Sequence, residues 1–308
     1  MKKRFVLIMI LALLMFLVSC KEKTNISVNI HEEVIDIPGI DNKYNIFFLS
    51  DSHISMCDSR DPEVMEKAQS REDAFTADAV KPEERFDELI NVAKKSDNDM
   101  VILGGDILDS AMYASIEHLY SQLSTLKSPY LYLMGNHDFA YGKEYFSDVA
   151  YNEYLPRFEK MRDGTKYQIR EYEDIIFFSA DDTNNQIDKE ILDAYKSISK
   201  KEKPIVLAMH VPIEPITGDM TLVDKCREVW GTYGDNKSKV TLGINGICPD
   251  PVTQEFLDLI LSDDSPVVLV LAGHIHFYHK DTLNNNTVQI VTGPAYKGEA
   301  VRITLVGA

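Results

Sequence analysis

Five short apolar stretches of this chain each end abruptly in side chains that bind metal ions or carry protons. Residues 130–134, for example, run straight into Gly135-Asn136-His137-Asp138. A short apolar run bounded by glycine predicts a buried strand, and reactive side chains of α/β proteins gather where such strands end. The other four stretches end in Asp51-Ser52-His53, Gly105-Asp106-Ile107-Leu108-Asp109, His210 and Gly273-His274-Ile275-His276.

Taken singly, each of these strand ends is ordinary. A lone histidine there is more often a polar cap than a ligand, and a lone aspartate or asparagine is more often a turn residue. Together they hold five of the chain's eight histidines, and turn chemistry does not explain five such ends. Residues two apart share a face in an extended chain, so each Asp-x-His or His-x-His pair can point one way. We therefore expect one metal centre, with the other histidines at the surface: His31, His118 and His279.

Strands and helices alternate in the first half of the chain, and hairpins follow in the second half. Helical periodicity is clear at residues 84–96 and 187–198, and weaker at 116–126. Residues 167–172 and 175–179 predict a hairpin, and residues 287–291 and 300–305 predict closing strands. This order predicts an α/β chain of two sheets packed together with helices outside them. A single doubly wound sheet is the alternative.

The N-terminus has the pattern of a secretory signal. Residues 1–4 are basic, residues 5–18 are apolar, and Ser19 and Cys20 follow like a bacterial lipobox. We expect residues 1–19 to be a lipoprotein signal peptide, with Cys20 as the lipidated first residue. An uncleaved anchor is the alternative, and either would tether the protein to a membrane of the bacterial cell envelope, outside the cytoplasm. Residues 20–43 would be a tether with a possible edge strand, and residues 44–308 one large domain.

Composition limits the partners of this chain. The apolar fraction of 44% is that of a globular protein and excludes a disordered chain. The net charge of −17 and the lack of a basic patch argue against binding nucleic acid through its phosphates. A cysteine pair within an oxidising compartment permits a disulfide, and Cys226 with Cys248 is the pairing we favour, which leaves Cys57 unpaired.

The five strand ends, taken together and in this order, resemble the signature of the calcineurin-like metallophosphoesterase family. The resemblance spans about residues 44–305 and includes every block of that signature. It implies a two-metal site on a four-layer sandwich, in which two mixed β-sheets are flanked by α-helices. It also implies hydrolysis of a small-molecule phosphate ester by direct attack of metal-bound hydroxide on phosphorus.

Position by position, the resemblance assigns ligands to two metals that share Asp106. The first metal would be held by Asp51, His53, Asp106 and His276, and the second by Asp106, Asn136, His210 and His274. Mixed carboxylate and imidazole ligands suit Mn, Fe or Zn. His137 would act as the acid and oxyanion stabiliser, Asp138 would orient His137, and Asp109 would support the backbone.

The resemblance leaves the ester class open. A phosphodiester is slightly favoured over a phosphomonoester, and a non-catalytic metal-containing binding lipoprotein is the alternative of another class. Two long insertions, residues 54–82 and 214–246, lack clear periodicity and are expected to border the pocket. Trp230, Tyr233 and Phe139 are candidates for stacking on a base or sugar, with local core packing as the more common role of such residues.

Overall fold

The computed structural model describes residues 26–140, 148–162, 166–215, 221–232, 236, 240–243, 245–284 and 286–308. The expected signal peptide, Cys20 and Tyr233 lie outside the described residues. Among the helices that are described, none is both long and apolar enough to cross a membrane.

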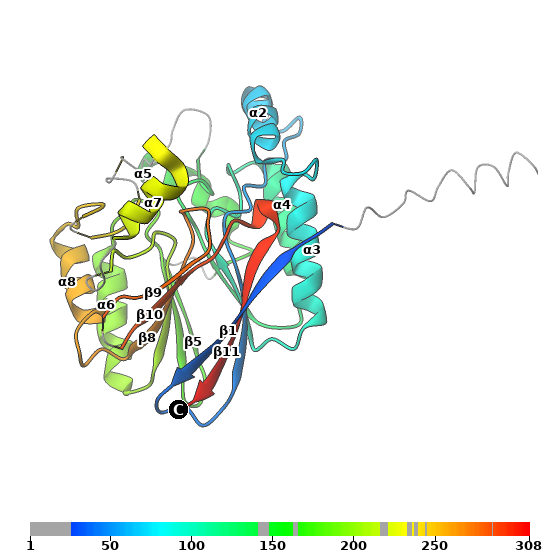
Figure 1. Cartoon of the computed structure of the whole chain (residues 1–308). Coiled ribbons are helices and arrows are strands. Elements are labelled where there is room, and N and C mark those ends of the chain that lie inside the picture. Colours follow the sequence, from blue (N-terminus) through cyan, green and yellow to red (C-terminus); the bar gives the residue numbers. More distant parts are fainter. Residues whose placement is uncertain are drawn as a thin grey trace, which may run out of the picture.

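Two mixed β-sheets form the centre of the molecule (Figure 1). The first has the order β1-β11-β2-β3-β4, and the second has the order β5-β6-β7-β8-β10-β9. The first sheet contains β1 (Asn29–Ile37), β11 (Glu299–Gly307), β2 (Tyr44–Leu49), β3 (Met100–Gly104) and β4 (Tyr130–Leu133). The second contains β5 (Tyr167–Glu171), β6 (Ile176–Ala180), β7 (Ile205–Ala208), β8 (Val267–Ala272), β10 (Val288–Val291) and β9 (His279–Thr282).

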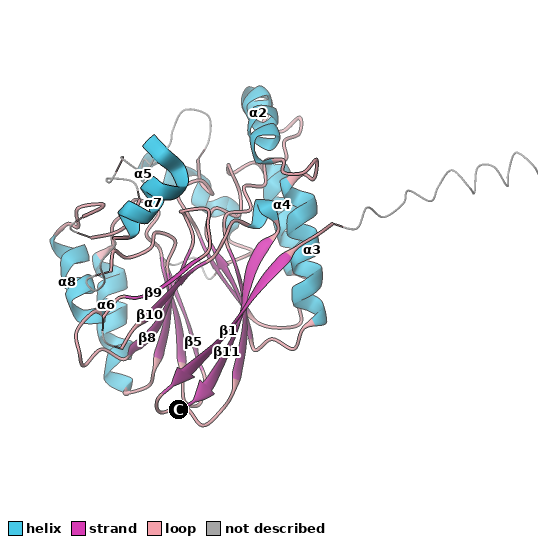
Figure 2. Ribbon diagram, viewed as in Figure 1, coloured by secondary structure: helices cyan, strands magenta, loops and turns pink. Residues whose placement is uncertain are grey.

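Helices cover the outer faces of both sheets, with α3 and α4 on the first sheet and α6 and α8 on the second (Figure 2). Helix α2 projects beyond the sandwich at the top of this view. The described helices are α2 (Met65–Phe75), α3 (Pro82–Lys95), α4 (Tyr113–Leu123), α5 (Asp148–Tyr154), α6 (Lys189–Ile198), α7 (Leu222–Trp230) and α8 (Pro251–Ile260).

Successive side chains along each strand point to opposite faces of the sheet, and this alternation separates the core between the sheets from the cores under the helices. In β2, Ile46 and Phe48 pack between the two sheets, whereas Phe47 and Leu49 pack toward the helices of the first sheet. In the second sheet, Phe178 faces its own helices and Phe177 faces the first sheet. Each of these side chains is fully buried, which stabilises the fold by about 1.5–3 kcal/mol per residue. The expected four-layer arrangement of two mixed sheets and outer helices is therefore confirmed, and the single doubly wound sheet is wrong.

The ends of the parallel strands place the five motifs at one edge of the sandwich. Strands β2, β3 and β4 are parallel to one another, and so are β6, β7 and β8. Each motif follows the carboxyl end of one of these strands, so the motifs lie together at the edge where ligands bind in open α/β sheets.

Some predictions about the insertions and cysteines were wrong. Residues 54–82 contain the helix α2, and residues 214–246 contain α7, although neither was expected to be helical. Helix α2 buries only Ala68 and Glu72, so it lacks the apolar stripe that marks most helices. The favoured disulfide is absent from the structure: Cys226 is free and buried in α7, whereas Cys248 is free and exposed.

Candidate metal centre

The backbone at the strand ends adopts an unusual conformation that turns the side chains toward one another. Asp51, His53, Asp106, His274 and His276 all have φ between +50° and +71°, in the left-handed region that non-glycine residues rarely adopt. Such residues cost of order 1–3 kcal/mol each and persist where the surrounding structure holds them. Hydrogen bonds hold the first two turns together, because the amides of Asp51 and His53 donate to the carbonyls of Gly105 and Asp106.

The first group of possible ligands contains Asp51, His53 and His276. The Nε2 atoms of the two imidazoles lie 3.1 Å apart. Oδ1 of Asp51 lies 3.3 Å from Nε2 of His276 and 3.9 Å from Nε2 of His53. These three atoms therefore face a common point.

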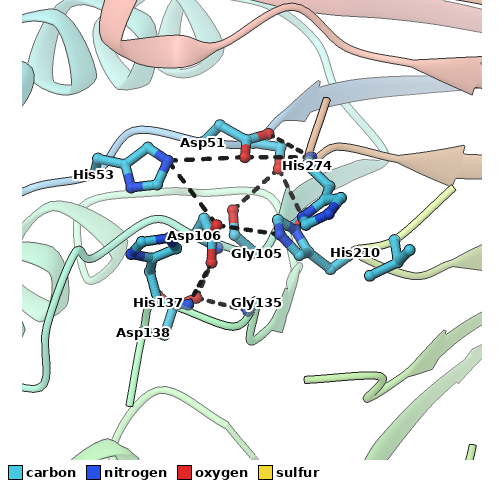
Figure 3. Close-up of polar contacts among 12 residues, drawn as sticks. Asp51, His53, Gly105, Asp106, Gly135, His137, Asp138, His210 and His274 are labelled. Atoms are coloured by element: carbon cyan, nitrogen blue, oxygen red, sulfur yellow. Dashed lines mark hydrogen bonds and ion pairs between the residues drawn. The ribbon is translucent and has the colours of Figure 1, made fainter. Parts of the chain in front are cut away.

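The second group contains Asp106, His210 and His274. Oδ2 of Asp106 lies 3.2 Å from Nε2 of His210 and 3.9 Å from Nε2 of His53. Asp106 thus stands between the two groups, as Figure 3 shows. Its other oxygen accepts a hydrogen bond of 2.7 Å from the amide of His137, which fixes the orientation of the carboxylate.

Neighbouring acceptors fix the protonation of two imidazoles. Nδ1 of His210 lies 2.8 Å from the carbonyl oxygen of Gly104, and Nδ1 of His53 lies 3.0 Å from Oδ1 of Asp109. Since these oxygens accept and do not donate, each Nδ1 carries the proton and each Nε2 is left to bind a metal. The Asp182 carboxylate, which the sequence did not single out, accepts from the amides of His210 and Val211 and supports the turn after β7.

The ligand atoms at the site are placed to bind metal ions rather than to form hydrogen bonds with one another. Oδ1 of Asn136 is buried and forms no hydrogen bond, and Nε2 of His210 faces only the Asp106 carboxylate. Buried polar atoms are normally satisfied, so an unsatisfied amide oxygen beside carboxylates and imidazoles fits the role of a metal ligand. A Cβ atom on Gly135 would collide with Asp106 and His210, so glycine there leaves room for the ligands. The carboxylates, imidazoles and amide together fit two ions with Asp106 between them.

The electrostatics of the site lead to the same conclusion. Burial alone would lower the pKa of His210, but the Asp106 carboxylate raises it to about 10. Burial would raise the pKa of Asp106, but the imidazoles of His210 and His137 hold it well below its ordinary value. Protons on imidazoles thus balance the buried carboxylates, and bound metal ions would replace those protons.

The contacts of Asp109 and Asp138 differ from those expected from the sequence. Asp138 accepts hydrogen bonds from the amides of Asp106 (2.7 Å), Leu108 (2.9 Å) and Gly135 (2.7 Å), so this carboxylate supports the backbone. The carboxylate beside Nδ1 of His137 is Asp109, with Oδ1 at 3.1 Å. Asp109 thus contacts the imidazole that Asp138 was expected to contact, and the catalytic roles of His137 and Asp138 stay predictions. Both carboxylates follow a strand end, and the sequence does not show which one turns toward the imidazole.

The first insertion borders the site, as expected, but through residues that the sequence did not single out. Arg71 donates from Nε and Nη2 to the two carboxylate oxygens of Asp109, and Phe75 stacks on His53. Tyr296, from the turn after β10, packs edge-on against Phe75 and His276. The one signal available in the sequence was the spacing of Arg71 and Phe75, which are four residues apart and so share one face of a helix.

The described part of the second insertion and two of the stacking candidates, Trp230 and Phe139, lie in local core. The described part of residues 214–246 packs through α7 against Ile275, between the two histidines of the last motif. Trp230 is half-buried against Phe277, and Phe139 is buried against Tyr151. His31, His118 and His279 stay apart from the ligand groups in the described residues and are partly buried beside Glu299, Asp87 and Asp281.

Comparisons with known proteins agree with this geometry. The model of the calcineurin-like phosphoesterase family matches residues 44–278. The comparison with curated proteins found no match. Among solved structures, a dimetal phosphatase from Danio rerio is 11% identical with a TM-score of 0.50, over 82% of this chain and 88% of that one.

Two further structures share the fold over part of their length. Purple acid phosphatase PPD1 from yellow lupin (Lupinus luteus) seeds is 13% identical with a TM-score of 0.51, over 86% of this chain and 46% of that one. PhoD is 10% identical with a TM-score of 0.50, over 85% of this chain and 58% of that one. This chain thus spans about half the length of the lupin enzyme. At these identities the likeness shows a common fold, and the family match covers more than half of the chain. The chain therefore belongs to the calcineurin-like phosphoesterase family and is a metal-dependent phosphoester hydrolase.

Proposed function

We propose that the site binds two transition-metal ions, Mn, Fe or Zn, and hydrolyses a phosphodiester of small size. The observation that carries this proposal is the position of Asp106. Its Oδ2 atom faces Nε2 of His210 at 3.2 Å and Nε2 of His53 at 3.9 Å. One carboxylate oxygen between two groups of ligands is the arrangement that two ions roughly 3.5–4 Å apart require.

The ligands divide between the two ions by their distances. Asp51, His53 and His276 would hold one ion, and His210, His274 and Asn136 would hold the other, with Asp106 shared. When bound, such ions acidify a water molecule and neutralise charge on the phosphate oxygens. Of these ligands, Asp51, His53, Asp106, Asn136 and His210 are buried, whereas His274 and His276 are partly exposed. The substrate therefore enters from the side of the two exposed histidines.

His137 is placed to donate a proton to the leaving group. Its side chain is 23% exposed, and Nδ1 lies 3.1 Å from Oδ1 of Asp109. Burial would lower the pKa of His137, but the carboxylates of Asp106 and Asp109 raise it above its ordinary value. With metal ions on Asp106, Asp109 is the carboxylate that stabilises the protonated imidazole.

The charges around the site favour a diester over a monoester. Among the described residues, Arg71 is a cationic side chain that contacts this group, and its guanidinium is bonded to the Asp109 carboxylate. A monoester carries a second negative charge that this arginine is not placed to neutralise. Phosphomonoester hydrolysis is the second candidate, because two proteins of similar fold are described as phosphatases.

The test compares bis-p-nitrophenyl phosphate with p-nitrophenyl phosphate as substrates of the metal-loaded protein. We expect a higher kcat/KM for the diester, and loss of both activities with Asp106→Asn because that change removes the shared ligand. His118→Ala is a matched control, since His118 pairs with Asp87 away from the site. A higher kcat/KM for the monoester would favour the second candidate, and an inactive metal-loaded wild type would contradict both.

We also propose that Cys20 carries a lipid that anchors the protein in the bacterial cell envelope. The proposal rests on the basic and apolar segments that precede Cys20 and on its lipobox-like context. Cys20→Ser should stop processing and release the protein from the detergent-soluble membrane fraction. Unchanged processing and membrane attachment of that variant would refute lipidation of Cys20.

A further inference from the structure

Four side chains beside the first ligand group form a closed ring of contacts. Nε of Arg71 lies 2.6 Å from Oδ2 of Asp109, and Nη2 lies 2.7 Å from Oδ1. Oδ1 of Asp109 in turn lies 3.0 Å from Nδ1 of His53. The ring of Phe75 stacks on His53 with centroids 4.0 Å apart and planes 4° apart, and the guanidinium carbon of Arg71 lies 4.8 Å from the Phe75 centroid.

We propose that Arg71 and Phe75, one helical turn apart on α2, are positioning residues that hold His53 and Asp109 in their working orientations. This inference rests on the proposed role of His53 as a metal ligand and adds the contribution of the helix. Neither residue belongs to the five motifs.

Phe75 acts on the plane of the His53 ring. A histidine can rotate about its last side-chain bond, and only some orientations aim Nε2 at an ion. The Asp109 contact fixes one edge of the ring and the Phe75 stack fixes its face, so Nε2 is left toward His276 at 3.1 Å. Tyr296 packs edge-on against Phe75, with the two ring centroids 4.9 Å apart. Contacts that fix a ligand in this way raise metal affinity because less freedom is lost on binding.

Arg71 acts on the Asp109 carboxylate. His53, Asp109 and His137 together form a third group that could hold a metal, with ligand atoms within 4.8 Å of one another. The fork of Arg71 occupies both oxygens of Asp109 and places a positive charge beside them. A cation is therefore disfavoured there, and the carboxylate remains available to His53 and His137.

Helix α2 contributes little to the buried core, which makes this role testable. It projects beyond the sheets in Figure 1 and buries only Ala68 and Glu72. Ser55 donates to the carbonyl of Ala68, and Lys81 pairs with Glu72 at 2.6 Å. Substituting Arg71 or Phe75 therefore removes little of the hydrophobic core.

The experiment measures binding of Mn²⁺ alone to the metal-free protein by calorimetry and by equilibrium dialysis. We expect Phe75→Leu and Arg71→Ala to weaken one of the two sites by about 10–100-fold, the usual effect of losing a contact that orients a ligand, and to leave the other site unchanged. Phe75→Tyr should keep wild-type affinity because it keeps the ring face. Arg71→Lys should behave like Arg71→Ala, because lysine keeps the charge without the fork.

Arg60→Ala is the matched control, since Arg60 lies on the same insertion and pairs with the exposed residues Asp58 and Glu117. The inference is overturned if Phe75→Leu and Arg71→Ala bind both ions as the wild type does. It is also overturned if they weaken both sites equally with a lower Tm of the metal-free protein, as a purely structural role requires. A wild type that binds no Mn²⁺, Zn²⁺ or Fe²⁺ would overturn the proposed function itself, and this inference with it.

Discussion

Asp109→Asn tests whether His137 is the proton donor and whether Asp109 is its partner. The carboxylate lies 3.1 Å from Nδ1 of His137 and is 2% exposed, so the contact is shielded from water. A hydrogen bond to a charged group is worth about 1.5–3 kcal/mol. Losing that energy when His137 must be protonated lowers kcat by roughly 10- to 150-fold.

The assay compares two diesters that differ in their leaving group. A p-nitrophenolate leaves without a proton, whereas an alkoxide needs one. Asp109→Asn should therefore retain most of its activity on bis-p-nitrophenyl phosphate and show the full loss on a diester with an alkyl leaving group. Metal content must be measured in parallel, because Asp109 also contacts His53. Asp58→Asn, an exposed change on the first insertion (residues 54–82), is the control.

Two results would refute this reasoning. An equal loss on both diesters, with lower metal content, would mean that Asp109 acts through the metal ligand rather than through the proton donor. Full activity on the alkyl diester would mean that the contact with His137 has no part in catalysis.

Three other predictions concern stability, metal binding and the thiols. Asp138→Ala leaves three buried amides without their acceptor, so chemical denaturation should show a loss of at least about 3 kcal/mol in the free energy of unfolding; a loss below about 1 kcal/mol would contradict this role. Metal affinity should rise with pH up to about 10, because Asp106 raises the pKa of His210 to about 10 and the imidazole binds metal only after losing its proton; calorimetry that finds the same affinity at pH 6 and 8 would contradict it. In the native protein a thiol reagent should modify the exposed Cys248 and reach the buried Cys226 only after unfolding; two thiols missing from the unfolded, unreduced protein would indicate a disulfide.

The sequence was sufficient to predict the sheets and the group of side chains that meets at their edge, because both have local signals. An apolar stretch such as 267–272 and a following His-x-His pair are visible without any partner. The carboxyl ends of parallel strands share an edge, so predicting the strands also brings the motifs together.

The residues that surround the ligands were harder to predict because their roles depend on tertiary contacts. Asp109 and Asp138 have the same chemistry and similar positions after a strand, and only the fold shows that Asp109 faces His137. Arg71 and Phe75 lie on a helix without an apolar stripe, so the sequence does not predict that helix. The sequence does not predict the path of the chain between Cys226 and Cys248, so it does not predict whether the two thiols meet. Both cysteines are free in the structure.

Crystals of the metal-free protein soaked in Mn²⁺ and measured at an anomalous wavelength test the central claim most directly. We predict two anomalous peaks, one among Asp51, His53 and His276 and one among Asp106, His210 and His274, with the Asp106 carboxylate between them. A single peak, or a peak within the third group formed by His53, Asp109 and His137, would contradict the two-metal site proposed for this chain.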